Sequence, residues 1–150
     1  MIPKFINIGS PWKILPPGVH IATMEEIEIC FATTNHRKFL FSGFKKAIIS
    51  LLESGCKSIF LDGSFITAKP IPNDYDVCWD TEDVNIQILN PVFLDFSNNR
   101  MEQKKKYYGE FLPAYSLADG EKFFLDFFHI DKYTGKAKGI IKINLENINR

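Results

Sequence analysis

Apolar residues recur at three- and four-residue steps over residues 35–54, and this spacing predicts the longest helix of the chain. Gly55 follows at the position where helices commonly take a left-handed stop. A shorter helix is predicted to end near Phe31, because Thr23 and Glu26 have the spacing of a capping box. The long helix has an apolar stripe of Leu40, Phe44, Ala47, Ile48, Leu51 and Leu52, and basic residues on its other faces, namely Arg37, Lys38, Lys45 and Lys46.

Strand patterns follow the long helix. Residues 58–61 form a compact apolar run typical of a buried strand, and residues 74–79 alternate acidic with apolar side chains at the period of a strand. Residues 123–130 and 139–145 are predicted as two further strands, with a turn at residues 134–136 between them.

The chain reads as a single domain over residues 1–150, without an internal repeat or a linker. Residues 1–22 are rich in Pro and Gly and are expected to form an extended arm packed along this domain. The polar residues 98–108 are predicted as a helix. The mixture of helices and strands predicts an α/β (α+β) fold in which helices pack on a sheet.

Composition narrows the function classes. With 45% apolar and 24% charged residues, the chain lies outside the range typical of disordered proteins. Its 18 basic and 18 acidic residues leave no net charge, so non-specific binding of duplex DNA is not expected. No run reaches the ~18 apolar residues of a membrane span, and the first residues lack the pattern of a secretory signal. Three scattered cysteines fit reduced thiols, and we expect a cytoplasmic protein.

Although the net charge is zero, acidic and basic residues are separated into two neighbouring segments of the chain. No Lys or Arg lies between Lys69 and Arg100, whereas the next residues, 100–106, contain four bases and one acid. A solvated loop explains the acids at positions 80, 82 and 83 but not those in the predicted strand. The acids of the stretch are Asp74, Asp76, Asp80, Glu82, Asp83 and Asp95.

Asp74 and Asp76 are two residues apart in a predicted strand, so their side chains point to the same face. Two carboxylates this close repel each other unless a cation lies between them. A hard divalent cation such as Mg²⁺ removes that penalty. The alternative is an exposed edge strand with both acids in water.

The turn before these acids favours the metal. Gly63 lets a backbone approach a phosphate closely, and Ser64 offers hydroxyl and backbone donors to an anion. A phosphate-binding turn followed by paired acids suits chemistry on an Mg²⁺-bound nucleotide.

The segments Leu61-Asp62-Gly63-Ser64-Phe65 and Pro72-Asn73-Asp74-Tyr75-Asp76-Val77 resemble the Gly-Ser and Asp-x-Asp signature of the polymerase-beta-type nucleotidyltransferase superfamily. The wider stretch from Leu15-Pro16-Pro17-Gly18 through Cys78-Trp79-Asp80 to the last strand is similar to a small single-domain bacterial subfamily of little-known function.

This resemblance implies a short, mixed, twisted sheet, nucleotide phosphates on Gly63 and Ser64, and two Mg²⁺ ions on Asp74 and Asp76. It also implies a third acid from a neighbouring strand. Asp126, flanked by apolar residues in the predicted strand 123–130, is the expected third acid and metal ligand, and Asp131 and Asp95 are weaker substitutes.

Basic residues supply further candidates for phosphate binding. After Gly63 and Ser64 the sequence departs from the family pattern, because no second Gly or Arg follows, and Thr67 or Lys69 is the candidate donor there. Arg100 and Lys104 share one face of the predicted helix and are expected to lie over the nucleotide. The alternative is a solvated face that balances the acids nearby.

These observations predict an Mg²⁺-dependent nucleotidyltransferase that moves a nucleoside monophosphate from an NTP, with ATP expected, to a hydroxyl of a protein, an RNA or a small molecule. One alternative is a non-catalytic module of the same fold that binds a partner protein, as in a toxin–antitoxin or defence pair. A third possibility is a structural α/β domain whose acids are solvated.

Overall fold

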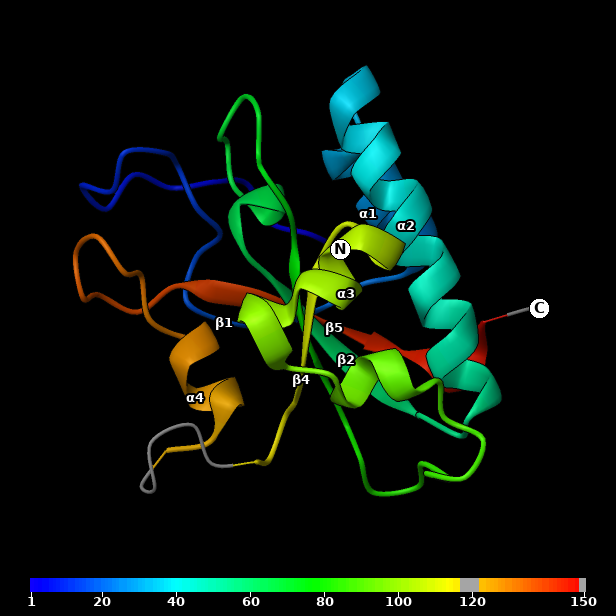
Figure 1. The fold of residues 1–150 in the computed structure, drawn as a ribbon. Coiled ribbons are helices and arrows are strands. Elements are labelled where there is room, and N and C mark those ends of the chain that lie inside the picture. Colours follow the sequence, from blue (N-terminus) through cyan, green and yellow to red (C-terminus); the bar gives the residue numbers. More distant parts are fainter. Residues whose placement is uncertain (117–121, 149–150) are drawn as a thin grey trace.

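The computed structural model describes residues 1–116 and 122–148 and contains a mixed, open, five-stranded sheet (Figure 1). The strand order is β1-β5-β2-β3-β4, in which β1 runs parallel to β5 and β3 runs parallel to β4, whereas β2 is antiparallel to both of its neighbours. The strands are β1 (Gly18–Ile21), β2 (Ser58–Asp62), β3 (Asp76–Trp79), β4 (Glu110–Pro113) and β5 (Gly139–Asn144).

Four α-helices are present in the described residues: α1 (Met24–Phe31), α2 (Asn35–Glu53), α3 (Ser97–Tyr107) and α4 (Phe124–Phe128). Three short 3₁₀ helices cover Ser64–Ile66, Pro91–Leu94 and Leu145–Asn147. None of these helices is both long and apolar enough to cross a membrane, a finding that covers the described residues alone.

Alternation along the strands gives the sheet two buried faces. Ile59 and Leu61 of β2 point into the main core with the apolar stripe of α2, whereas Phe60 points to the opposite face. That second face forms a smaller cluster in which Phe128 of α4 takes part. Helices α1, α2 and α3 therefore cover one face, and α4 lies apart from them on the other, as Figure 1 shows.

Most predicted elements are confirmed. Both N-terminal helices form, and the Thr23–Glu26 capping box is present. The strands predicted at residues 58–61 and 139–145 are β2 and β5. The helix predicted at residues 98–108 corresponds to α3, but the backbone of residues 98–100 is left-handed rather than helical. The strand predicted at residues 74–79 begins at Asp76, so Asp74 lies just before it.

Other predictions are wrong. Residues 123–130 form helix α4 rather than a strand, because a short continuous apolar run does not alternate and suits a buried helix equally well. The arm predicted over residues 1–22 is not among them, since it ends in the extended edge strand β1 and its Ile14 and Leu15 are buried against the domain. Strand β4 was not expected. Arg37, predicted to lie outside the apolar stripe of the long helix, is buried.

Gln103 secures the edge of the sheet. Its buried side-chain amide donates to the carbonyls of Val92 and Phe111 at 3.1 Å each, and its oxygen accepts the Phe111 N–H at 2.8 Å. The side chain therefore satisfies both the N–H and the carbonyl of Phe111, as a neighbouring strand would, and it fixes β4 against α3.

Replacing Gln103 with Met keeps the size of the side chain and removes all three hydrogen bonds. Since buried backbone groups of β4 would be left unsatisfied, we expect Gln103→Met to lower the free energy of unfolding by roughly 2 kcal/mol or more. Urea denaturation measures this change, and Gln87→Met, on an exposed side chain, is the matched control. Equal stability of the two variants would contradict the role given to Gln103.

Candidate functional site

Three acids meet where β3 and β4 begin. Asp76 opens β3 and pairs in parallel register with Glu110, which opens β4. Asp74 lies two residues before Asp76, and one carboxylate oxygen of each acid lies within 4.8 Å of the others. The pairing of two neighbouring strands therefore brings Glu110 next to Asp74, although the two acids are 36 residues apart in the sequence.

Asp76 is the acid least compatible with a free negative charge. Burial raises the pKa of its carboxyl well above the usual range, and the charges of Asp74 and Asp62 and a hydrogen bond with Glu110 raise it further. Its Oδ1 is buried and has no hydrogen-bond partner among the described residues. Burial and the charge of Glu110 also raise the pKa of Asp74.

Glu110 is in the opposite state. Burial of its carboxyl is outweighed by the hydrogen bonds from Asp76 and Lys104 and by the charge of Arg100, so its pKa lies below the usual range. Without a cation, the proton of the Asp76–Glu110 pair therefore resides on Asp76.

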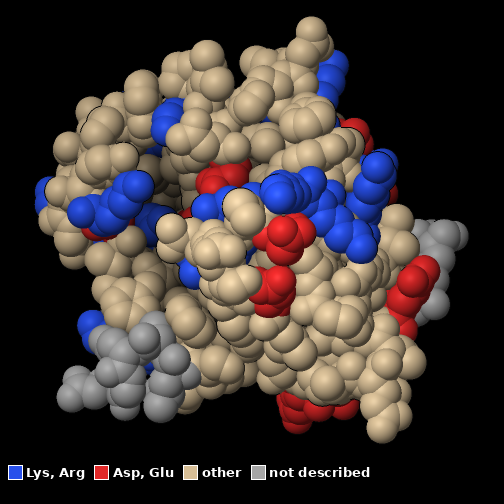
Figure 2. Space-filling model, viewed as in Figure 1, with Lys and Arg blue, Asp and Glu red and all other residues tan. Residues whose placement is uncertain are grey.

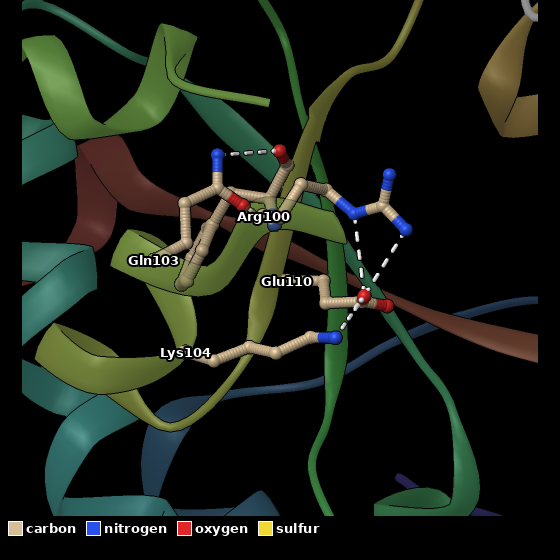
Figure 3. A network of polar contacts seen from close by, with 5 residues as sticks. Arg100, Gln103, Lys104 and Glu110 are labelled. Carbon is tan, nitrogen blue, oxygen red and sulfur yellow. Dashed lines mark hydrogen bonds and ion pairs between the residues drawn. The ribbon is translucent and has the colours of Figure 1, made fainter. Parts of the chain in front are cut away.

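Arg100 and Lys104 of α3 converge on Glu110 (Figure 3). The Arg100 Nε and Nη2 donate to Glu110 Oε1 at 3.2 and 3.1 Å, and Lys104 Nζ contacts the same oxygen at 3.1 Å. The expectation that these two residues share a regular helix face is not met, because the backbone of Arg100 is left-handed, but both side chains are directed at the third acid. The backbone of Arg100 is left-handed, with φ 60°, and it is the last of three consecutive residues with left-handed backbone angles.

The Gly63–Ser64 turn lies directly against the acids. Gly63 has φ +92°, and a Cβ at this position would lie 3.1 Å from both the backbone N and Oδ2 of Asp76. A side chain here would be strained and would crowd the acid, so glycine is required for this approach. Ser64 then opens the 3₁₀ helix Ser64–Ile66.

Arg37 of α2 holds the segment after this turn. Its guanidinium donates to the carbonyls of Phe65, Thr67 and Lys69 at 2.6, 2.9 and 2.7 Å, and to that of Phe31 at 3.2 Å. Four carbonyls on one buried cation fix the path of the backbone. Helix α2 therefore positions the turn as well as forming the core.

A pocket of about 330 Å³ opens beside the turn and the acids. Figure 2 shows a hollow on this face with acidic side chains inside it and Lys and Arg around it. A buried ion pair, Lys138 Nζ to Asp62 Oδ1 at 2.8 Å, lies in the lining. The other polar lining residues are Ser10, Gly63, Ser64, Thr67, Lys69, Asn73, Asp74, Asp76, Asp131 and Lys132.

The structure brings most of the predicted site together. Gly63, Ser64, Lys69, Asp74 and Asp76 all line this pocket. Arg100 and Lys104 reach the acid cluster through Glu110.

Asp126 does not join the cluster. It is an exposed residue in the first turn of α4, where its Oδ2 accepts the Phe123 N–H at 2.9 Å. The expectation that it lies on a strand is wrong, and Glu110 has the neighbouring-strand position instead. Of the weaker substitutes, Asp95 accepts from Ser97 near the start of α3, and Asp131 lines the pocket while holding a turn at Thr134.

Sequence reasoning missed Glu110 because strand β4 is only four residues long and follows the basic helix without an alternating pattern of its own. The sequence feature that could have indicated Glu110 is the glycine before it, Gly109. A Cβ at Gly109 would lie 2.4 Å from the Tyr75 ring, which marks a close approach between the segments that carry Glu110 and the aspartates.

Comparisons with known proteins add one finding. No curated protein and no solved structure matches this chain. The model of a family of unknown function, DUF6932, matches residues 9–144, a range that includes the three acids and the Gly63–Ser64 turn. The chain therefore belongs to the DUF6932 family.

Proposed function

We propose that this protein is an Mg²⁺-dependent nucleotidyltransferase that moves a nucleoside monophosphate from an NTP to a hydroxyl group. The observation that carries the proposal is the meeting of Asp74, Asp76 and Glu110 beside the Gly63–Ser64 turn. The resemblance to the polymerase-beta-type superfamily implies a third acid on a strand beside the Asp pair, and Glu110 of β4 occupies such a position.

The acid cluster has the properties of a site for a hard divalent cation. It offers three carboxylates, and such ligands are the ones that Mg²⁺ prefers. The buried Asp76 Oδ1 has no partner among the described residues, although buried polar atoms are nearly always satisfied. A cation held by Asp74, Asp76 and Glu110 supplies that partner and removes the repulsion among the acids.

Within this proposal each residue has a definite task. Asp74, Asp76 and Glu110 would hold the metal, which when bound neutralises charge on the phosphates and on the attacking oxygen. Gly63 and Ser64 would donate to the phosphates of the NTP, with Lys69 as a further cation in the lining of the same pocket. Arg100 and Lys104 hold Glu110 in place and lower the net charge of the cluster.

Asp76 couples metal binding to protons. Because its pKa is raised, the metal-free protein retains a proton there, and binding of a cation releases it. Metal affinity should therefore increase as pH rises through the raised pKa. The acceptor hydroxyl, on a protein, an RNA or a small molecule, stays an open part of the proposal.

The decisive experiment compares the two candidate third acids. Purified protein is incubated with cell lysate, Mg²⁺ and each α-³²P-labelled NTP, and labelled protein and RNA are detected. We expect transfer from ATP, and a loss on the order of 100-fold or more in Asp74→Asn, Asp76→Asn and Glu110→Gln, because each removes a ligand charge. Asp126→Asn should retain activity, since an amide oxygen can still accept the Phe123 N–H.

Two results would count against this proposal. Absence of nucleotide binding by the wild type, with Asp76→Asn indistinguishable from it, would overturn the function. Binding of Mg²⁺ and NTP without any transfer, together with a co-purifying protein, would favour the non-catalytic partner-binding module.

The raised pKa of Asp76 makes a separate prediction for the metal-free protein. Since folded Asp76 holds its proton more tightly than the unfolded chain does, wild-type stability falls as pH rises from the ordinary value near 4 through the raised pKa. Asp76→Asn has no such loss. In EDTA at pH 8 its Tm should exceed that of the wild type by at least about 2–4 °C.

The difference in Tm between Asp76→Asn and the wild type should shrink as pH is lowered toward 4, where residue 76 is uncharged in both proteins. Thermal melts followed by circular dichroism measure it, and Glu82→Gln, on an exposed acid, controls for the change in net charge. A lower Tm for Asp76→Asn at pH 8 would show that the carboxylate is not destabilising.

A further inference from the structure

The pocket has a second wall whose chemistry the acids and the turn do not use. This part of the lining is apolar rather than polar. It consists of aromatic and aliphatic residues, namely Trp12, Ile14, Phe127, Phe128, Ile130 and Tyr133. A single pocket therefore joins a charged surface to an aromatic one. A ligand that uses both needs an anionic group and a flat apolar group within one small molecule.

Three rings of this wall remain open to solvent. Trp12 is 37% exposed, Phe127 is 42% exposed and Tyr133 is 58% exposed, whereas the other tryptophan, Trp79, is fully buried in the core. Lys122 Nζ lies over the Phe127 ring at 5.6 Å from its centroid, and Lys132 Nζ lies over the Tyr133 ring at 5.1 Å, so one face of each of these rings is taken by a cation. The exposed ring of Trp12 and the remaining exposed faces of Phe127 and Tyr133 offer surfaces on which a planar ligand can stack.

The wall is built from two segments that are far apart in the sequence. Trp12 belongs to the N-terminal arm, and Tyr133 belongs to the turn between Ile130 and Ala137, which form an antiparallel bridge. In Figure 1 the blue N-terminal loop and the orange loop after α4 project on the same side of the sheet.

Polar contacts lock these two segments together. The Ser10 hydroxyl donates to Asp131 Oδ1 at 3.2 Å, and Lys136 Nζ donates to the Ile8 carbonyl at 3.1 Å. Asp131 is itself buried, and it also accepts from Thr134, so the contact has a fixed acceptor.

The arm is also tied to the segment after the Gly63–Ser64 turn. The Ala68 N–H donates to the carbonyl of Lys13 at 2.9 Å, next to Trp12 in the sequence. The aromatic wall therefore has a set position relative to the proposed phosphate-binding turn. Both walls are parts of one preformed pocket.

We propose that Trp12, with Phe127 and Tyr133, forms the stacking surface for the base of the bound nucleotide. The inference rests on the proposed function, because the polar wall is taken to hold the phosphates. A pocket of about 330 Å³ is at the lower end of the range for small-molecule sites, a size that suits one nucleotide. Stacking depends on the π-face that all bases share, so these rings add affinity for every NTP.

The test separates the base from the phosphates by using two probes, Mg²⁺-ATP and Mg²⁺-tripolyphosphate, which lacks a base. Isothermal titration calorimetry with the full chain measures both affinities. Trp12→Ala should weaken Mg²⁺-ATP binding by roughly tenfold and leave tripolyphosphate binding unchanged. Trp12→Phe, which keeps an aromatic ring, should retain most of the affinity for Mg²⁺-ATP.

Tyr115→Ala is the matched control. Tyr115 is an aromatic residue that is 50% exposed but does not line the pocket, and its truncation should affect neither probe. Circular dichroism melts verify that each variant is folded. Fluorescence gives a second readout, because Mg²⁺-ATP should quench the exposed Trp12 in the wild type and leave the emission of Trp79 unchanged in Trp12→Phe.

The outcomes distinguish this inference from the function on which it rests. If the wild type binds both probes and Trp12→Ala binds Mg²⁺-ATP as tightly as the wild type does, the stacking surface is wrong and the proposed function stands. An equal loss for both probes in Trp12→Ala also overturns the stacking role. If the wild type binds neither probe, the proposed function fails and the inference fails with it.

Discussion

The structure depends on one electrostatic constraint, which is the repulsion among three carboxylates held at the start of β3 and β4. Parallel pairing places Asp76 opposite Glu110, so the sheet itself fixes the two acids side by side. Two devices make this arrangement tolerable in the metal-free chain. The proton stays on Asp76, and Arg100 and Lys104 neutralise Glu110. Each device is local to one acid, and Oδ1 of Asp76 still lacks a partner among the described residues. The cluster is thus stabilised only in part by the protein's own groups.

The surrounding elements act mainly to hold this arrangement still. Gln103 closes the edge of β4 and so determines where Glu110 stands. Arg37 binds the carbonyls of the segment after the Gly63–Ser64 turn, and Gly63 lets that turn approach Asp76. These contacts join α2, α3 and three strands around one point. The buried polar side chains of Gln103 and Arg37 fix the orientation of these segments more strictly than apolar packing does, because hydrogen bonds depend on angle as well as distance.

Local signals in the sequence were sufficient for part of this structure. The helices α1 and α2, the strands β2 and β5, and the pairing of Asp74 with Asp76 follow from periodicity and capping, which are encoded within a few residues. The third acid was not accessible in this way. Glu110 reaches the site through the β3–β4 register, a contact across 34 residues as counted from Asp76, and its one local signal is the preceding Gly109. Asp126 drew attention because its flanking residues are apolar, yet those residues bury one side of a short helix and leave the acid as a cap. Arg37 was predicted only to lie outside the apolar stripe, and its burial depends on four backbone carbonyls from distant segments that helix periodicity does not reveal.

The pocket shows how a small domain extends its chemistry beyond a compact sheet. The central strands supply the acids and the turn that, under the proposed function, would bind metal and phosphate, whereas the apolar surface of the pocket comes from other segments. The N-terminal arm and the segment after α4 supply that surface, and the contacts Ser10–Asp131 and Lys136–Ile8 fasten the two segments together. Because these segments lie outside the strands that carry the acids, their side chains can change without disturbing the β3–β4 register. Selectivity for the non-phosphate part of a ligand is therefore physically separable from the charge arrangement at the acids, and the arm is a structural part of the site.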